Sequence, residues 1–387
     1  MRIRIPHIVL LLFLSSCQTI QFENPSIVSD SDWLVDGQSQ ERTRAYAFDA
    51  ALPFEEAWEY NAAAAFGPGS PLILEGVILA ATRKGEVHTV ELSTGRKWGF
   101  KSFSDGIEGS PAIDNGRMFI SSAVGKRTLV AWDLKRGRKL WRYKGSGFES
   151  GLVVQDNMVI GADVDAVVKA FDQADGTLLW TRSLGEMSSV QSTPLLVNLD
   201  RLFVADDRGN AFLLNVHTGD VIWESLLTGP VYESATAADG LVFVPTTRGA
   251  IDALDLHTGQ LVWTLTQELS TLRFGGLATD GKHVYAGATD GLVRAVDVST
   301  GEVVWSSSFP DVISAAPLVT DRHIFVGSMG KMIYGLNRET GALEWDAELK
   351  GRVKSAMAAT QNGIVVLSEP RYITYFTSSE GSDVRKK

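Results

Sequence analysis

The sequence predicts an all-β protein, an eight-bladed β-propeller of four-stranded antiparallel blades that is closed by an N-terminal strand completing the last blade. Three observations support this prediction. A short phrase ending in tryptophan recurs about every 40 residues along the chain. Hydrophobic residues make up 44%, Gly is frequent at 37 of 387, and no long helical run without a breaker occurs, as expected for short strands and tight turns. The two ends of the repeat region are partial units that complete each other.

The repeated phrase is a tight turn that runs into a tryptophan. Its clearest copy spans residues 255–263, from Asp255 through Gly259 to Trp263. Consecutive tryptophans of the series lie 39 to 43 residues apart, and the first of them has no turn before it. A fixed period of this length indicates a repeat architecture in which each repeat is one supersecondary unit. The series consists of Trp58, Trp98, Trp141, Trp180, Trp223, Trp263, Trp305 and Trp345.

Each full repeat contains four predicted strands. In the unit that ends at Trp305, we expect strands over residues 273–279, 283–288, 292–298 and 302–307, separated by turns rich in Asp, Ser and Gly. Four antiparallel strands in about 40 residues make one sheet, and one sheet is one propeller blade.

Each residue type in the repeated phrase occurs at its position for its own physical reason. The Asp or Asn that opens the turn accepts bonds from the backbone two residues on, and the Gly four positions later takes the positive φ of a hairpin bulge. A tryptophan on the outer strand is best interpreted as a wedge between adjacent blades, because its N–H needs a carbonyl partner when the ring is buried. The alternative is an aromatic surface that binds a ligand, but such a site would not need regularly spaced copies.

The two ends of the repeat region predict how the ring closes. The last unit has strands over 353–359, 364–367 and 372–376 but no tryptophan strand, whereas residues 57–60 form a tryptophan strand with no repeat before it. Pairing these two partial units gives an eighth blade and removes the exposed edges of an open ring. We therefore expect the propeller over residues 54–379 and a polar tail over 380–387.

The N-terminal residues resemble a bacterial lipoprotein leader. Residues 1–16 contain two early arginines, a short apolar run and small residues before Cys17, which is the only cysteine of the chain. Leu14 to Cys17 resembles a lipobox, in which the cysteine becomes the lipidated first residue, and Gln18 then implies the outer membrane. A plain secretory leader with an incidental cysteine is the alternative. We interpret residues 17–53, rich in Ser, Asp and Gln, as a flexible tether.

The charge and the motifs of the chain argue against several functions. A net charge of −10 disfavours nucleic acid, because its binding depends on neutralising phosphates. The chain contains no G-x-S-x-G elbow, no H-E-x-x-H helix, no EF-hand loop and no P-loop. A single cysteine and scattered histidines offer no metal-ligand set. The sequence therefore predicts a non-enzymatic protein without cofactor or metal.

The repeat resembles the quinoprotein-type, PQQ-like propeller repeat, which is carried here by strands such as 248–255 followed by His257, Thr258 and Gly259. Seven such units, an N-terminal closing strand and a lipobox together resemble the BamB lipoproteins of the outer-membrane β-barrel assembly machinery. The resemblance implies a lipid-anchored scaffold facing the periplasm. It also implies docking on the POTRA domains of BamA, contact with other assembly subunits, and help in the insertion of unfolded outer-membrane proteins.

The same resemblance implies a docking surface, for which two placements compete. In the family, an L-x-L-R segment enters a middle blade and acidic residues follow in the next. By motif, Leu272 and Arg273 with Asp311 fit, with one extra residue inside the motif. By counting blades from the C-terminus, the segment falls at residues 186–191 and the acidic residue is Glu233. Arg273 is alternatively an ordinary surface arginine.

Two other functions use the same repeat. Quinoprotein oxidoreductases are built on it, although the repeat implies the fold and not the cofactor. A propeller that binds a small ligand or a polysaccharide is a further alternative.

Overall fold

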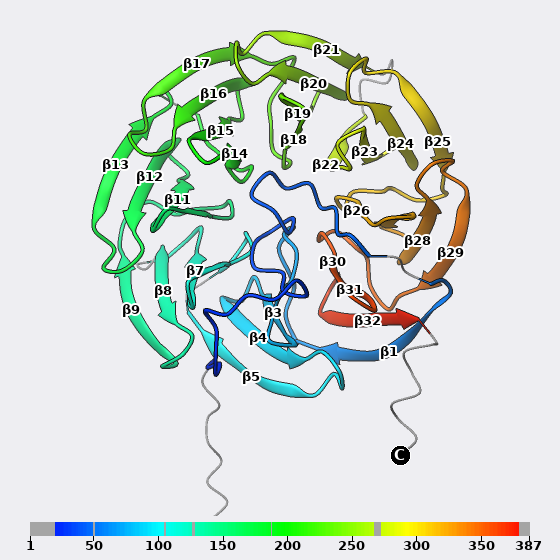
Figure 1. Ribbon diagram of the computed structural model, residues 1–387, viewed down its shortest axis with the longest axis horizontal. Helices are drawn as coiled ribbons and strands as arrows, with labels where there is room; N and C mark the ends of the chain where they lie inside the picture. Colours follow the sequence, from blue (N-terminus) through cyan, green and yellow to red (C-terminus); the bar gives the residue numbers. More distant parts are fainter. Residues whose placement is uncertain are drawn as a thin grey trace, which may run out of the picture.

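The computed structural model of the chain describes residues 20–48, 51–103, 106–125, 128–186, 188–266 and 272–378. These residues form eight four-stranded antiparallel sheets around one central axis (Figure 1). The prediction of an all-β, eight-bladed propeller is confirmed. The predicted tail over 380–387 lies outside the described residues.

Seven blades follow the chain from the inner to the outer strand. Blade 1 is β2 (Leu72–Leu74), β3 (Val77–Ala81), β4 (Glu86–Glu91) and β5 (Lys97–Ser102). Blade 2 is β6 (Ala112–Asp114), β7 (Arg117–Ser121), β8 (Leu129–Asp133) and β9 (Arg138–Tyr143). Blade 3 is β10 (Val153–Gln155), β11 (Met158–Ala162), β12 (Val167–Asp172) and β13 (Leu178–Ser183). Blade 4 is β14 (Leu195–Asn198), β15 (Arg201–Ala205), β16 (Asn210–Asn215) and β17 (Val221–Leu226).

The remaining blades complete the ring. Blade 5 is β18 (Thr236–Ala238), β19 (Leu241–Thr246), β20 (Ala250–Asp255) and β21 (Leu261–Thr266). Blade 6 is β22 (Phe274–Thr279), β23 (His283–Ala288), β24 (Leu292–Asp297) and β25 (Val303–Ser308). Blade 7 is β26 (Leu318–Val319), β27 (His323–Gly327), β28 (Met332–Asn337) and β29 (Leu343–Glu348). Blade 8 is β30 (Ala358–Thr360), β31 (Gly363–Ser368), β32 (Tyr372–Ser378) and β1 (Phe54–Asn61).

The closing strand pairs as the sequence predicted. β1 lies antiparallel to β32 as the outer strand of blade 8, with Trp58 opposite Tyr375 in the register. The first strand of the propeller thereby supplies the tryptophan strand that the last repeat lacks. Trp58 Nε1 of this strand also donates to the carbonyl of Leu92 in blade 1 at 2.8 Å, so the last blade contacts the first, as ring closure requires.

The turn of the repeated phrase has the predicted geometry. The carboxylate Oδ1 of Asp255 accepts backbone N–H bonds from His257 at 2.9 Å and from Thr258 at 2.7 Å. Gly259 has φ of 72°, in the left-handed region that favours glycine. The strand register shifts between Ala253 and Leu254, which marks the expected bulge.

The tryptophans join neighbouring blades. The indole Nε1 of Trp263 in blade 5 donates to the carbonyl of Val298 in blade 6 at 2.9 Å. The same bond to a neighbouring blade is made by Trp58, Trp141, Trp180, Trp223, Trp305 and Trp345. The prediction of a wedge with a carbonyl partner is confirmed for these seven. Trp98 packs instead against Phe22, with ring centroids 5.5 Å apart.

The ring has two faces that carry different connections. The connections between blades and the turns between second and third strands lie on one face, which we call the loop face. The turns between first and second strands, and between third and fourth strands, lie on the other face, which we call the plug face. This division follows from four antiparallel strands per blade.

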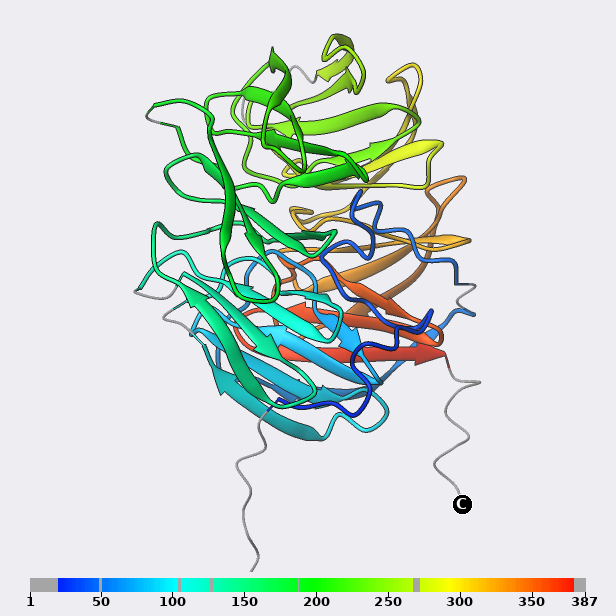
Figure 2. The ribbon, with the colours of Figure 1, turned by 60° about the vertical axis from the view of Figure 1, so that its left-hand side comes forward.

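Residues 20–48 cover the plug face, so the prediction of a flexible tether over 17–53 is wrong for this segment (Figures 1 and 2). Trp33 is fully buried and its backbone exchanges two hydrogen bonds with Ile73 of β2. Ala45 forms a parallel bridge with Val319 of β26 on the other side of the axis. The segment packs through isolated bridges and scattered apolar side chains, and such contacts leave no periodic pattern in the sequence.

Candidate functional site

The candidate site is the mouth of the central channel on the loop face. Each blade reaches the axis through a short connection just before its inner strand, and these connections contain small residues because eight chain segments converge there. A Cβ at Gly109, for example, would overlap the backbone of Gly151 in the next blade. The wall positions include Gly69, Ser110, Ser150, Thr193, Ser234, Gly276, Ser314 and Ala316.

Residues 20–48, which we call the plug, place three charged side chains in the axis behind this mouth. Arg44 Nη2 lies 3.1 Å from Asp36 Oδ2, and Arg42 Nε lies 3.6 Å from the same oxygen. Arg42 Nη1 also donates to the carbonyl of Pro194 at 2.6 Å, and Arg44 Nη1 donates to that of Leu277 at 2.9 Å. The two arginines therefore bind blades 4 and 6 and hold one buried carboxylate between them.

The ionisation of this cluster follows from its partners. Burial alone would raise the pKa of Asp36, but the charges of Arg44 and Arg42 and a bond from Ser70 outweigh burial and hold that pKa below its usual value. Burial lowers the pKa of Arg42 to about 10, against the opposing effect of Asp36. Asp36 and Arg42 are therefore both charged at neutral pH. Arg42 and Arg44 also have positive φ, a backbone strain that such contacts must hold in place.

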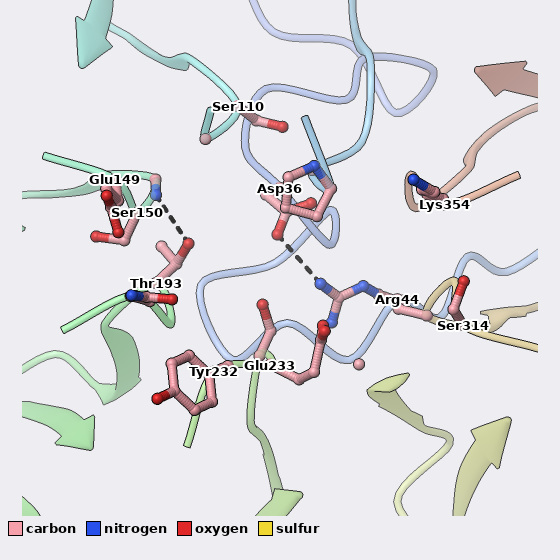
Figure 3. Close-up of a pocket in the computed structure, with 18 residues that line it drawn as sticks. Asp36, Arg44, Ser110, Glu149, Ser150, Thr193, Tyr232, Glu233, Ser314 and Lys354 are labelled. Carbon is pink, nitrogen blue, oxygen red and sulfur yellow. Dashed lines mark hydrogen bonds and ion pairs between the residues drawn. The ribbon is translucent and has the colours of Figure 1, made fainter. Parts of the chain in front are cut away.

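The open side of the mouth carries charged and aromatic side chains (Figure 3). Glu233 is exposed to solvent, yet protein surrounds it in the concave mouth, and this partial burial raises the pKa of its carboxyl to about 6 while the charge of Arg44 opposes the shift. Tyr232 is 42% exposed beside it. Glu149 and Lys354 line the same cavity, and Lys354 Nζ lies 3.0 Å from Glu369 Oε2.

The residues at the axis do not fit a quinone cofactor. The cavity among them is about 40 Å³, whereas pockets for small molecules are about 300–1,000 Å³. A larger ligand would have to displace Arg44 and Asp36 from their ion pair. Within the described residues, no group of three His, Cys, Asp or Glu side chains is placed to hold a metal ion. No described helix is long and apolar enough to cross a bilayer.

The structure separates the residues of the motif-based docking placement. Leu272 is 1% exposed and packs in the core between blades 5 and 6, so its side chain does not lie on the surface of the free protein. The neighbouring Arg273 is exposed at the start of blade 6, and its Nη1 donates to the carbonyl of Leu272 at 2.7 Å. Leu272 therefore anchors the segment that presents Arg273.

Arg273 and Asp311 meet at one hairpin turn. The backbone N–H of Thr289, in the β23–β24 turn, donates to Arg273 O at 2.9 Å. Gly291 at the other end of that turn packs against the backbone of Asp311, which is half-buried. Glu233 lies in the connection before blade 5. All three residues are in blade-to-blade connections, so both docking placements lie on the loop face.

Sequence reasoning missed the buried cluster of Asp36, Arg42 and Arg44. Charged residues within a polar segment of low periodicity are typical of a tether, and only tertiary contacts distinguish this segment from one. The isolated Trp33 was the available signal, since a lone large aromatic ring needs a buried environment. Cys17, the predicted lipidation residue, lies outside the described residues.

Comparisons with known proteins agree with this geometry. The sequence profile of the family described as "Outer membrane protein assembly factor BamB" matches residues 41–164, 164–312 and 289–384. The assembly factor BamB of Legionella pneumophila is 24% identical over 188 residues, 46% of this chain and 48% of that protein. The chain thus spans about half the length of this relative. A tetrathionate hydrolase of Acidithiobacillus ferrooxidans is 25% identical over 51% of this chain and 38% of the enzyme.

A solved structure shares the fold. The crystal structure of BamB from Moraxella catarrhalis superposes with a TM-score of 0.70 at 19% identity, covering 84% of this chain and all of that one. At this identity the superposition supports the propeller alone. The family profile, in contrast, covers the chain from residue 41 to residue 384 with its PQQ-like repeats. The chain therefore belongs to the BamB family of outer membrane protein assembly factors.

Proposed function

We propose that this chain is a non-enzymatic scaffold lipoprotein of outer-membrane β-barrel assembly. It is held at the outer membrane through Cys17, faces the periplasm and docks on the POTRA domains of BamA, where it aids the insertion of unfolded outer-membrane proteins. The observation that carries the proposal is the family match over residues 41–384. The absence of a recognisable catalytic motif in the sequence is consistent with it.

The loop face suits a docking role. Its connections are held by closed sheets on both sides, so they form a broad and rigid surface. Arg273 and Asp311 lie at one hairpin turn of this face, and Glu233 and Tyr232 lie at its centre. Arginine and tyrosine are over-represented among the residues that dominate binding energy in protein interfaces. We place the BamA-binding surface on the loop face between the channel mouth and blade 7.

The plug supports a scaffold more than an enzyme. Arg44 and Asp36 occupy the axis of the channel, and their buried contacts leave little room for a substrate. An oxidoreductase or a hydrolase that used the axis of the ring as its active site would need a larger pocket at the mouth. A polysaccharide-binding propeller would use the same open face, and ligand-induced thermal stabilisation would detect it.

The test is capture of the native protein from detergent-solubilised membranes through a C-terminal tag. The proposal predicts that BamA co-purifies in stoichiometric amount. Capture of the intact lipoprotein without BamA would overturn the proposal, while oxidation of alcohols or sugars after addition of quinone and calcium would favour the enzyme.

A further inference from the structure

Positive charge is concentrated in one part of this acidic chain. From Arg96 to Lys144 there are 12 Lys and Arg residues against 4 Asp and Glu, a net charge of +8, although the whole chain carries −10. This stretch runs from the outer strand of blade 1 to the end of the outer strand of blade 2. The other blades are therefore strongly acidic by comparison.

The same positions of the repeat carry different residues in the other blades. The residue two places before the tryptophan is Arg96 in blade 1 and Lys139 in blade 2. In blades 3 to 7 it is apolar and exposed: Leu178, Val221, Leu261, Val303 and Leu343. The residue three places after the tryptophan is Lys101 in blade 1 and Lys144 in blade 2. In blades 3 to 7 it is Ser183, Leu226, Thr266, Ser308 and Glu348.

Most of these cations are not neutralised by an acidic side chain, although Lys97 Nζ lies 4.5 Å from the ring centroid of Phe100 and Lys101 Nζ lies 5.5 Å from that of Trp132. Arg96 and Arg136 lie near Glu91 and Asp133 at 3.4 and 2.9 Å. Over the described part of the chain, no ion pair involves the exposed side chains of Lys97, Lys101, Lys135, Arg138, Lys139, Arg142 and Lys144. We call these seven residues the basic rim. A rim of unpaired charges of one sign contributes little to folding and suits an anionic partner.

The described N-terminal segment begins between β5 of blade 1 and β9 of blade 2, the two outer strands beside which the basic rim lies (Figures 1 and 2). The carbonyl of Ile20 accepts a bond from Trp132 Nε1 in blade 2 at 2.9 Å, and Gln21 Nε2 donates to the carbonyl of Lys135 at 2.9 Å. Phe22 packs on Trp98 of blade 1. These contacts fix the exit point of the chain at the rim of blades 1 and 2.

The residue that we propose to carry the lipid, Cys17, comes three positions before Ile20 in the sequence. Only two residues separate Cys17 from Ile20 in the sequence, so their Cα atoms lie at most about 11 Å apart, because consecutive Cα atoms are about 3.8 Å apart. If Cys17 carries acyl chains, the bilayer surface must be within that reach of Ile20. The basic rim is then the part of the propeller nearest to the lipid headgroups.

We propose that the basic rim of blades 1 and 2 binds the anionic phospholipid headgroups of the membrane that holds the anchor. The inference rests on the lipid anchor of the proposed function. Each Lys or Arg close to an anionic bilayer strengthens binding about fivefold, within a Debye length of about 8 Å at physiological salt. Acyl chains and the basic rim together fix both the distance and the orientation of the ring, with the membrane beside the edge of blades 1 and 2.

The test uses the mature protein carrying Cys17→Ser, so that the acyl chains do not dominate binding. Co-sedimentation is measured with vesicles of phosphatidylcholine alone and with phosphatidylglycerol added. The rim variant combines Lys97→Gln, Lys139→Gln, Arg142→Gln and Lys144→Gln. The matched control combines Arg208→Gln, Arg248→Gln, Lys282→Gln and Lys331→Gln, four exposed cations of blades 4 to 7. Both variants have the same net charge, and unchanged melting temperatures establish that both are folded.

The proposal predicts binding only to the anionic vesicles, weakened at least about tenfold in the rim variant and less than about twofold in the control. Equal binding by the two variants, or equal binding to both kinds of vesicle, would overturn it. A rim variant that loses BamA in native capture but keeps vesicle binding would assign the rim to an acidic protein partner and also overturn it. Vesicle binding through the rim without BamA capture would contradict the proposed scaffold function alone.

Discussion

Arg44 lies 3.1 Å from Asp36 at the centre of the propeller, and both belong to a segment that precedes the first blade. The pair joins the N-terminal segment to the ring, because Arg44 also binds the carbonyl of Leu277 in blade 6 and Asp36 accepts a backbone bond from Ser70 before blade 1. The plug is therefore a structural part of the propeller.

Arg44→Ala is expected to lower the free energy of unfolding by about 3–5 kcal/mol, because it leaves Asp36 buried with one cation fewer. Lys282→Ala, an exposed cation of blade 6, is the control and should change it by less than about 0.5 kcal/mol. Urea unfolding followed by tryptophan fluorescence measures both. Equal stability of the two variants would mean that the plug does not hold the ring.

Trp263→Ala is expected to destabilise the protein by about 3–5 kcal/mol through loss of the wedge between blades 5 and 6. Trp263→Phe keeps a ring but leaves the carbonyl of Val298 without its indole donor, so a loss of about 1–3 kcal/mol is expected. Thermal or urea unfolding gives the order of the variants. A phenylalanine variant as stable as the wild type would show that the indole hydrogen bond does not contribute to stability.

Gly259→Ala tests the contact between the turn glycine of one repeated phrase and the tryptophan of the phrase before it. A Cβ at this position would lie 2.7 Å from the ring of Trp223 in the preceding blade, and the backbone has positive φ. We expect a loss of more than about 1 kcal/mol from strain and overpacking together. Gly281→Ala has φ of 87° but nothing within 4 Å of its Cβ, so it measures the backbone contribution alone. Equal losses in the two variants would contradict the contact with Trp223.

Glu233 is expected to titrate at about pH 6 in the folded protein, measured by carboxyl ¹³C chemical shifts. The folded pKa lies above the ordinary value of 4.5, so its stabilising contribution is present below about pH 4.5 and is lost as pH rises through about 6. Glu233→Gln should therefore be more stable than wild type above pH 6, by a fraction of 1 kcal/mol because solvent screens the exposed carboxyl. A titration midpoint at 4.5 would contradict the burial of this group.

The regular part of the fold was predictable because one cause acts in every repeat. The tryptophan spacing, the Asp or Asn that opens most of the turns and the partial units at both ends predict eight blades and their closure. The sequence did not predict the close packing of Gly259 on Trp223, because the positive φ of the turn already accounted for a glycine at this position. The plug was missed because Arg42, Arg44 and Asp36 become a buried cluster only through contacts with distant blades.

The docking residues could be predicted only in part. A motif identifies Arg273 but cannot tell that Leu272 faces the core, since both lie where the chain enters a strand. Counting blades reaches Glu233, and the fold places both candidates on one face. A choice between them depends on a partner surface, which the sequence of one chain does not contain.

The most direct test of the scaffold is the binding of the purified mature protein to purified POTRA domains of BamA from the same organism, by isothermal titration calorimetry. We expect saturable one-to-one binding, weakened at least about tenfold by Arg273→Glu with no fall in melting temperature, and unaffected by Arg182→Glu on the outer rim of blade 3. Binding lost on Glu233→Lys but kept in Arg273→Glu would move the contact to the channel mouth. No binding by the folded wild-type protein would contradict the account.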